Sequence, residues 1–175
     1  AETATNNGQF TVDLGAVNNT GAAVVVSYTV SGTATATGDY EALSGTVSVA
    51  AGAQTATIDV AGIVDDTLFE NNETVIVTLT GTNHSGFTAS NSPSATVTIA
   101  DNDNAAASIN ADLSVTTQGK EDGPVDIVYT VTLAKTNNTG SAITFDLTRD
   151  SGSASSGSDF TAIPSGAKIT VANGA

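Results

Sequence analysis

The sequence predicts an all-β protein built as an antiparallel β-sandwich of about seven strands. Three observations support this prediction: short segments alternate apolar and polar residues, Gly, Asn, Asp and Ser gather between those segments, and no window has good helical periodicity. Successive side chains of a strand point to opposite faces, so an alternation with a period of two indicates a strand with one buried face.

The alternating segments follow one another through the first hundred residues. Their apolar positions are Phe10, Val12 and Leu14; Val24, Val26, Tyr28 and Val30; Val47 and Val49; Ile58 and Val60; Val75, Val77 and Leu79; and Val97 and Ile99. Residues with permissive backbones separate them at 18–21, 37–39, 51–52 and 83–86, where strands need connections. Residues 69–75 can form at most a turn, because Asn is a poor helix former and Thr, Val and Ile prefer strands.

The second part of the chain repeats the first. The sequence Asn-Asn-Thr-Gly at 18–21 recurs at 137–140, an offset of 119 residues that also places Glu2 on Glu121. Asp39 matches Asp159 at an offset of 120, and residues 49–53 match 171–175 at an offset of 122. Tandem copies of one module indicate an array. We expect one repeat over residues 1–103 and the N-terminal half of a second over 104–175, which has a candidate opening strand at 107–113 and stops after its fourth strand.

Charge is distributed unevenly between these two parts. Residues 1–103 contain 11 Asp and Glu but no Lys or Arg, whereas all four cations, Lys120, Lys135, Arg149 and Lys168, come later. Nucleic acid and anionic membrane surfaces are therefore not expected as partners, because binding to phosphates depends on Lys and Arg. Membrane insertion is not expected either, since no apolar run approaches the roughly 20 residues that span a bilayer.

Several carboxylates crowd into two short segments, residues 65–73 and 101–103. Neighbouring carboxylates raise each other's pKa unless a cation lies between them, and hard oxygen ligands in this number suit calcium. In an antiparallel sandwich the first segment follows one strand and precedes the next, and the second segment ends the last strand, so both can meet at one pole. The alternative is that these residues only form turns and a solvated acidic face.

Four ordered blocks resemble the Calx-beta family, which is known from regulatory domains of sodium/calcium exchangers, from integrin beta-4 and from repeats of very large bacterial surface proteins. The blocks are Gly-Asp-Tyr at 38–40, Ser-Gly-Thr-Val at 44–47, the acidic segment with its preceding residues at 63–73, and residues 96–103. The resemblance implies a Greek-key sandwich that binds calcium in loops at one end. It covers nearly all of residues 1–103 and, as a half-copy, residues 107–175.

The resemblance also implies a set of calcium ligands, by position. They are Glu2, Asp39, Asp65, Asp66, the carbonyl of Leu68, Glu70, Glu73, Asp101 and Asp103, with Glu121 and Asp159 as the second-repeat counterparts of Glu2 and Asp39. Thr67 and Asn102 stand where the richest calcium-binding members have acidic residues. One or two ions are therefore expected rather than four.

Other polar residues have simpler interpretations. Asp13 and Asp59 alternate with core residues and should face solvent, while Tyr40 and Phe160 should plug the core beneath their loops. His84 is expected to be a loop histidine, because a nucleophile needs a base held by a third group. Carboxylate pairs can hydrolyse glycosides, but a chain with 5% aromatic residues and no Trp offers little to build a sugar-binding cleft. Asn18, Asn72, Asn83 and Asn137 head Asn-x-Ser/Thr triplets, which leaves glycosylation open.

These observations predict a non-enzymatic, calcium-stabilised repeat that extends a secreted or cell-surface protein, in adhesion or in an extracellular fibre. A calcium-sensing regulatory domain is the alternative, and a third interpretation is an accessory domain of a secreted hydrolase. The expected partners are neighbouring repeats or copies of the same chain, which can join head-to-tail. We expect another copy, or the chain's continuation, to cover residues 104–175 at Val131, Leu133, Ile143, Phe145 and Ile169.

Overall fold

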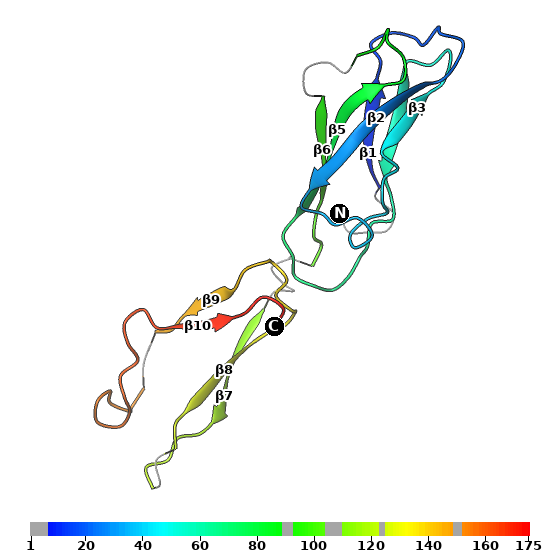
Figure 1. Cartoon of the computed structure of the whole chain (residues 1–175). Coiled ribbons are helices and arrows are strands. Elements are labelled where there is room, and N and C mark those ends of the chain that lie inside the picture. The colour runs from blue at the N-terminus through cyan, green and yellow to red at the C-terminus, as the bar shows by residue number, and fades with distance from the viewer. Residues whose placement is uncertain (1–6, 89–92, 104–109, 123–124, 149–151) are drawn as a thin grey trace. The chain divides into compact units, whose positions relative to one another are not determined.

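The computed structural model describes residues 7–88, 93–103, 110–122, 125–148 and 152–175, which form strands and their connections (Figure 1). The chain divides into two compact units: unit 1 comprises Ala1–Asp66 and Asn72–Asn102, and unit 2 comprises Thr67–Asn71 and Asp103–Ala175. The prediction of an all-β protein is confirmed. A helix that could cross a membrane is absent from the described residues.

The described residues of unit 1 form six strands in two sheets. The smaller sheet pairs β1 (Gly8–Asp13) with β4 (Thr55–Val60), and the larger has the order β3 (Thr46–Val49), β2 (Val24–Gly32), β5 (Glu73–Thr82) and β6 (Ser94–Ile99). All pairings are antiparallel. Because β1 pairs with β4 and β2 with β5, strands distant in sequence become neighbours, as a Greek-key path requires.

The apolar positions of the alternating segments form the core of unit 1. Thirteen buried residues make it up: Phe10, Val12, Val24, Val26, Tyr28, Tyr40, Val49, Ile58, Val60, Ile63, Val75, Val77 and Ile99. Leu14, Val47, Leu79 and Val97 are partly buried against them. Val30 differs from the prediction because it is 37% exposed. Strand β3 pairs with β2 only from Val24 to Ser27, so Val30 has no β3 residue beside it.

The described residues of unit 2 form four strands. Strand β7 (Ala111–Thr117) pairs with β8 (Val128–Leu133), and β9 (Ile143–Asp146) pairs with β10 (Lys168–Val171). The opening strand was expected over 107–113. Residues 107–109 lie outside the described residues, and the strand runs on to Thr117 because it pairs with β8 from Ala111↔Leu133 to Thr117↔Val128, with a register shift between Val115 and Thr117.

Unit 2 has much less apolar burial than unit 1. Leu113 is 61% exposed and Tyr129 is 49% exposed. The five side chains expected to need cover, Val131, Leu133, Ile143, Phe145 and Ile169, are half-buried. Among the described residues of unit 2 only Asn137 reaches full burial, so its two hairpins leave much apolar surface in contact with water.

Candidate calcium site

Strand ends bring several candidate ligands to one end of unit 1. Glu73, the first residue of β5, lies opposite Ile99, the last residue of β6. Two residues further on, Asp101 is only 7% exposed, and its backbone N–H donates to Oδ1 of Asn72 at 3.2 Å. The start of β5 and the end of β6 are thereby held together, with Glu73 and Asp101 on the paired segments.

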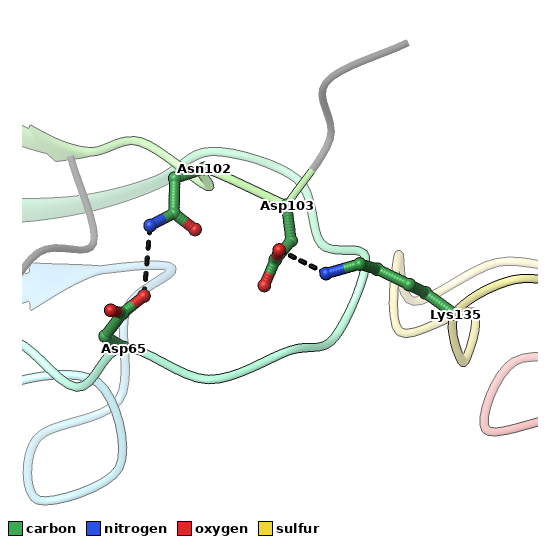
Figure 2. A network of polar contacts seen from close by, with 4 residues as sticks. All are labelled: Asp65, Asn102, Asp103 and Lys135. Carbon is green, nitrogen blue, oxygen red and sulfur yellow. Dashed lines mark hydrogen bonds and ion pairs between the residues drawn. The ribbon is translucent and has the colours of Figure 1, made fainter. Parts of the chain in front are cut away.

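The segment that follows β4 reaches the same end of unit 1. The side-chain amide of Asn102 donates to Oδ1 of Asp65 at 3.0 Å (Figure 2). Asn102 is one of the two positions where the sequence departs from the richest calcium binders, and its neutral amide stabilises Asp65 where a carboxylate would repel it. The neighbouring Asp66 is exposed.

Asp39 lies on a turn that is joined to this segment, since the N–H of Val64 donates to the Asp39 carbonyl at 3.1 Å. Its Oδ2 accepts the N–H of Thr35 at 2.5 Å, so the carboxylate closes its own turn. Beneath the turn, Tyr40 is buried, as predicted. Burial and the negative charge of Asp39 raise the pKa of the Tyr40 phenol.

The second repeat builds the same turn from Asp159. Its Oδ2 accepts the N–H of Ser155 at 2.6 Å, matching the bond that Asp39 makes. The candidate ligands Asp39 and Asp159 therefore each stabilise the turn that carries them. Phe160, the counterpart of Tyr40, is partly buried, and Glu121 is exposed in unit 2.

The segment Thr67–Asn71 lies between β4 and β5 in the sequence but belongs to unit 2, where it binds the loop after β8. The N–H of Phe69 donates to the carbonyl of Thr136 at 3.2 Å, and the N–H of Asn138 donates to the carbonyl of Phe69 at 3.0 Å. The side-chain amide of Asn138 also donates to Oε1 of Glu70. Glu70 and Leu68, two of the candidate ligands, are half-buried in this arrangement.

Asp103, the last candidate, forms an ion pair with Lys135 of the second repeat (Figure 2). The side chains of Lys135 and Asp103 are only 19% and 18% exposed. Sequence reasoning missed Lys135. Its position in the repeat could have indicated a special role for Lys135. The offset of 119 residues places Lys135 on Ala16, so the first repeat has no cation at the matching position.

The described candidate ligands have the right chemistry for calcium, although they do not form a complete coordination shell. Every proposed donor is a hard oxygen atom, and Asp103 already attracts a cation, the Lys135 ammonium. Within the described residues, no group of three or more acidic side chains lies close enough to hold a metal ion. Glu2 lies outside the described residues. Asp39, Asp65, Asp66, Glu73 and Asp101 belong to unit 1, and Leu68, Glu70, Asp103, Glu121 and Asp159 belong to unit 2.

Two buried asparagines were also missed as structural residues. Asn18 and Asn137 are both 0% exposed. The Asn18 amide donates to the carbonyls of Ala22 and Val49 at 2.8 and 3.0 Å, while its Oδ1 accepts the N–H of Thr20 at 3.1 Å. The recurrence of Asn-Asn-Thr-Gly was the signal for this role. Because Asn18 and Asn137 are fully buried, neither side-chain nitrogen can carry a glycan in the folded protein.

The chain matches the family model of the Calx-beta domain over residues 2–103 and 115–170. No curated protein matches the chain. Calx-beta domains are β-sandwich modules associated with calcium binding, and the family is non-catalytic. The match spans most of the chain and agrees with the sandwich of unit 1 and with the acidic segments at its strand ends. The chain therefore belongs to the Calx-beta family.

Proposed function

We propose that this protein is a calcium-binding structural repeat that extends an extracellular adhesin or fibre. The observation that carries the proposal is the end of unit 1, where Asp65, Glu73 and Asp101 lie on segments held together by hydrogen bonds. Residues 1–103 contain no Lys or Arg to balance these charges. Calcium would supply the missing positive charge.

Each candidate residue has a distinct task in this proposal. Asp101 is mostly buried, so its carboxylate is the one that gains most from a cation, because water screens it least. Asp65 is already oriented by Asn102 and needs little reordering to bind. Asp66 is exposed and brings a second carboxylate to the same segment. The loops at the strand ends would then be held by the metal in addition to their hydrogen bonds.

An extending role is supported by the tandem arrangement. One copy of the module is followed, at a nearly constant offset, by the N-terminal half of a second, and tandem repeats of this kind add length to a protein. Metal-stiffened loops would make the module, and the junctions between successive modules, resist bending. The family consists of modules that are typically extracellular or surface-exposed, which supports a cell-surface location.

Calcium titration of two matched variants tests the proposal. Asp66→Asn should weaken calcium binding by at least about tenfold, because calcium affinity depends on the number of charged ligands. Asp13→Asn removes the same charge from an exposed residue of β1 and should leave the dissociation constant nearly unchanged. Isothermal titration calorimetry at about 0.15 M salt, where exposed charges are screened beyond roughly 8 Å, is the measurement. Equal losses in both variants would mean a diffuse counter-ion atmosphere and no site.

A further inference from the structure

We propose that His84 is a pH-sensitive switch in the turn at residues 83–87, which follows β5: the neutral imidazole closes the turn, and protonation of the ring opens it. The turn lies where β5 ends at Thr82, whereas the candidate ligand Glu73 lies where β5 begins. The inference therefore concerns the opposite end of unit 1 from the acidic segments and needs no metal ion.

The imidazole of His84 closes the turn through its Nδ1 atom. The backbone N–H of Gly86 donates to Nδ1 at 3.1 Å, so this nitrogen keeps its lone pair and the ring proton is on Nε2. An imidazolium carries a proton on both nitrogens and accepts no hydrogen bond. Protonation of His84 therefore turns two donors, the Nδ1–H and the Gly86 N–H, toward each other, and the ring must rotate away.

The chain uses the same kind of turn elsewhere with an acceptor that does not titrate. Oδ1 of Asn18 accepts the N–H of Thr20 at 3.1 Å, and Oδ1 of Asn137 accepts the N–H of Thr139 at 3.3 Å. In each case a side chain accepts the backbone N–H two residues further on, as His84 does. Histidine is the side chain whose charge ordinarily changes between about pH 5 and 8, so only the His84 turn has an acceptor that a proton can remove in this range.

The neighbours of the ring hold it in the closed position. A Cβ atom on residue 86 would lie 3.1 Å from both Nδ1 and Cε1 of His84, so the glycine permits this close approach. The ring also contacts Phe87, with the two ring centroids 5.6 Å apart and an angle of 57° between the planes. His84 is nevertheless exposed, so protons reach it from water.

Other hydrogen bonds anchor both ends of the turn. Asn83 exchanges two bonds with Val25 of β2: its N–H donates to the Val25 carbonyl at 3.0 Å, and its Oδ1 accepts the Val25 N–H at 2.9 Å. The Thr82 hydroxyl lies 2.8 Å from the carbonyl oxygens of His84 and Phe87. Protonation of the imidazole removes none of these bonds. We therefore expect only the tip of the turn to open, which exposes more of the Phe87 ring.

Few charged groups surround the turn. Residues 14–38 and 74–100 contain no Asp, Glu, Lys or Arg. Tyr28 of β2 is buried in the core, and the carboxylate of Asp13, at the end of β1, accepts hydrogen bonds from its own turn and from a glutamine side chain. A response of the turn to mildly acidic pH can therefore be assigned to His84.

The experiment measures water exchange of the Gly86 amide by NMR in the full chain with EDTA present, at about pH 8 and about pH 5. After correction for the intrinsic effect of pH, protection should fall at least about fivefold at the lower pH, which is the scale of one hydrogen bond. The Thr20 amide, bonded to Asn18, is the internal control and should keep its protection.

Two variants separate the acceptor from its charge. His84→Asn supplies an amide oxygen that does not titrate, so the Gly86 amide should stay protected at both pH values. His84→Phe keeps an aromatic ring without an acceptor, and the amide should be unprotected at both. If the unchanged protein keeps its protection in acid, or His84→Asn loses as much as the unchanged protein does, the switch is refuted.

A second measurement needs no variant. The ¹⁵N chemical shifts of the imidazole in the unchanged protein should show the Nε2–H tautomer at about pH 8. A ring protonated on Nδ1 at that pH would also refute the switch, because Nδ1 could not then accept from Gly86. Since all of these measurements are made in EDTA, failure of the switch and failure of calcium binding are distinguishable.

Discussion

At the scale of single residues, the buried asparagines show how one side chain can stabilise a strand connection. Asn18 is fully buried, and its side-chain amide donates to the carbonyls of Ala22 and Val49, the second of these hydrogen bonds being buried. An unpaired buried polar group costs about 1–3 kcal/mol. The residue therefore joins the connection after β1 to the end of β3.

We predict that Asn18→Ala lowers the free energy of unfolding by about 3 kcal/mol, because it removes a fully buried side chain together with its hydrogen bonds to Ala22 and Val49. Asn19→Ala changes the adjacent, exposed residue and should have an effect within about 0.5 kcal/mol. Urea denaturation followed by circular dichroism measures both. Similar losses for the two variants would show that the connection, and not the buried amide, provides the stability.

At the scale of elements, the turn that carries Asp39 is strained in one repeat and relaxed in the other. Thr37 has a φ of 71°, in the left-handed region that β-branched residues rarely adopt, and its N–H donates to the Tyr40 carbonyl at 2.7 Å. At the matching position the second repeat has Gly157, with a φ of 87° and a bond to the Phe160 carbonyl at 2.8 Å. The same hydrogen bonds therefore hold two different residues in one conformation.

Thr37→Gly is expected to stabilise unit 1 by up to about 1 kcal/mol. Left-handed backbone costs an L-residue roughly 1–2 kcal/mol, and the greater freedom of glycine in the unfolded chain offsets part of that gain. The reciprocal change, Gly157→Thr, should destabilise unit 2 for the same reason. Differential scanning calorimetry of both variants checks the signs, and a destabilised Thr37→Gly protein would show that the threonine side chain makes a compensating contact.

At the scale of the whole molecule, calcium should raise the stability of the first repeat. An ion that binds only the folded state adds about 2.7 kcal/mol at a concentration one hundred times its dissociation constant. EDTA should therefore lower the melting temperature, and millimolar calcium should raise it, in scanning calorimetry of the full chain. Identical transitions in both conditions would contradict calcium binding by this member of the family.

Self-association is the second prediction at this scale. Leu113 and Tyr129, on the paired strands β7 and β8, are 61% and 49% exposed, and apolar surface of this kind favours contacts between molecules. We propose that copies of the chain join head-to-tail through this surface, which would give open chains of variable length. Analytical ultracentrifugation should show mass increasing with concentration, and Leu113→Lys with Tyr129→Lys should reduce it. A monomer at every concentration would refute this.

The sequence by itself determined the strands and the core of unit 1. Alternation is a local property, so Phe10, Val26 and Val75 could be assigned to a buried face without knowing which strands pair. The acidic segments and their chemistry were equally visible, because ligand type depends on residue identity. Val30 shows the limit of this reasoning, since it lies beyond the residues of β2 that pair with β3, and local alternation does not reveal which strands pair.

Only the tertiary structure decided which distant segments meet. It placed Glu70 against Asn138 and Asp103 against Lys135, contacts that span 68 and 32 residues of the chain. It also buried Asn18 against the carbonyl of Val49, 31 residues away. Hydrogen bonds and ion pairs of this kind depend on how the backbone brings two loops together, and neither residue type nor local periodicity encodes that distance.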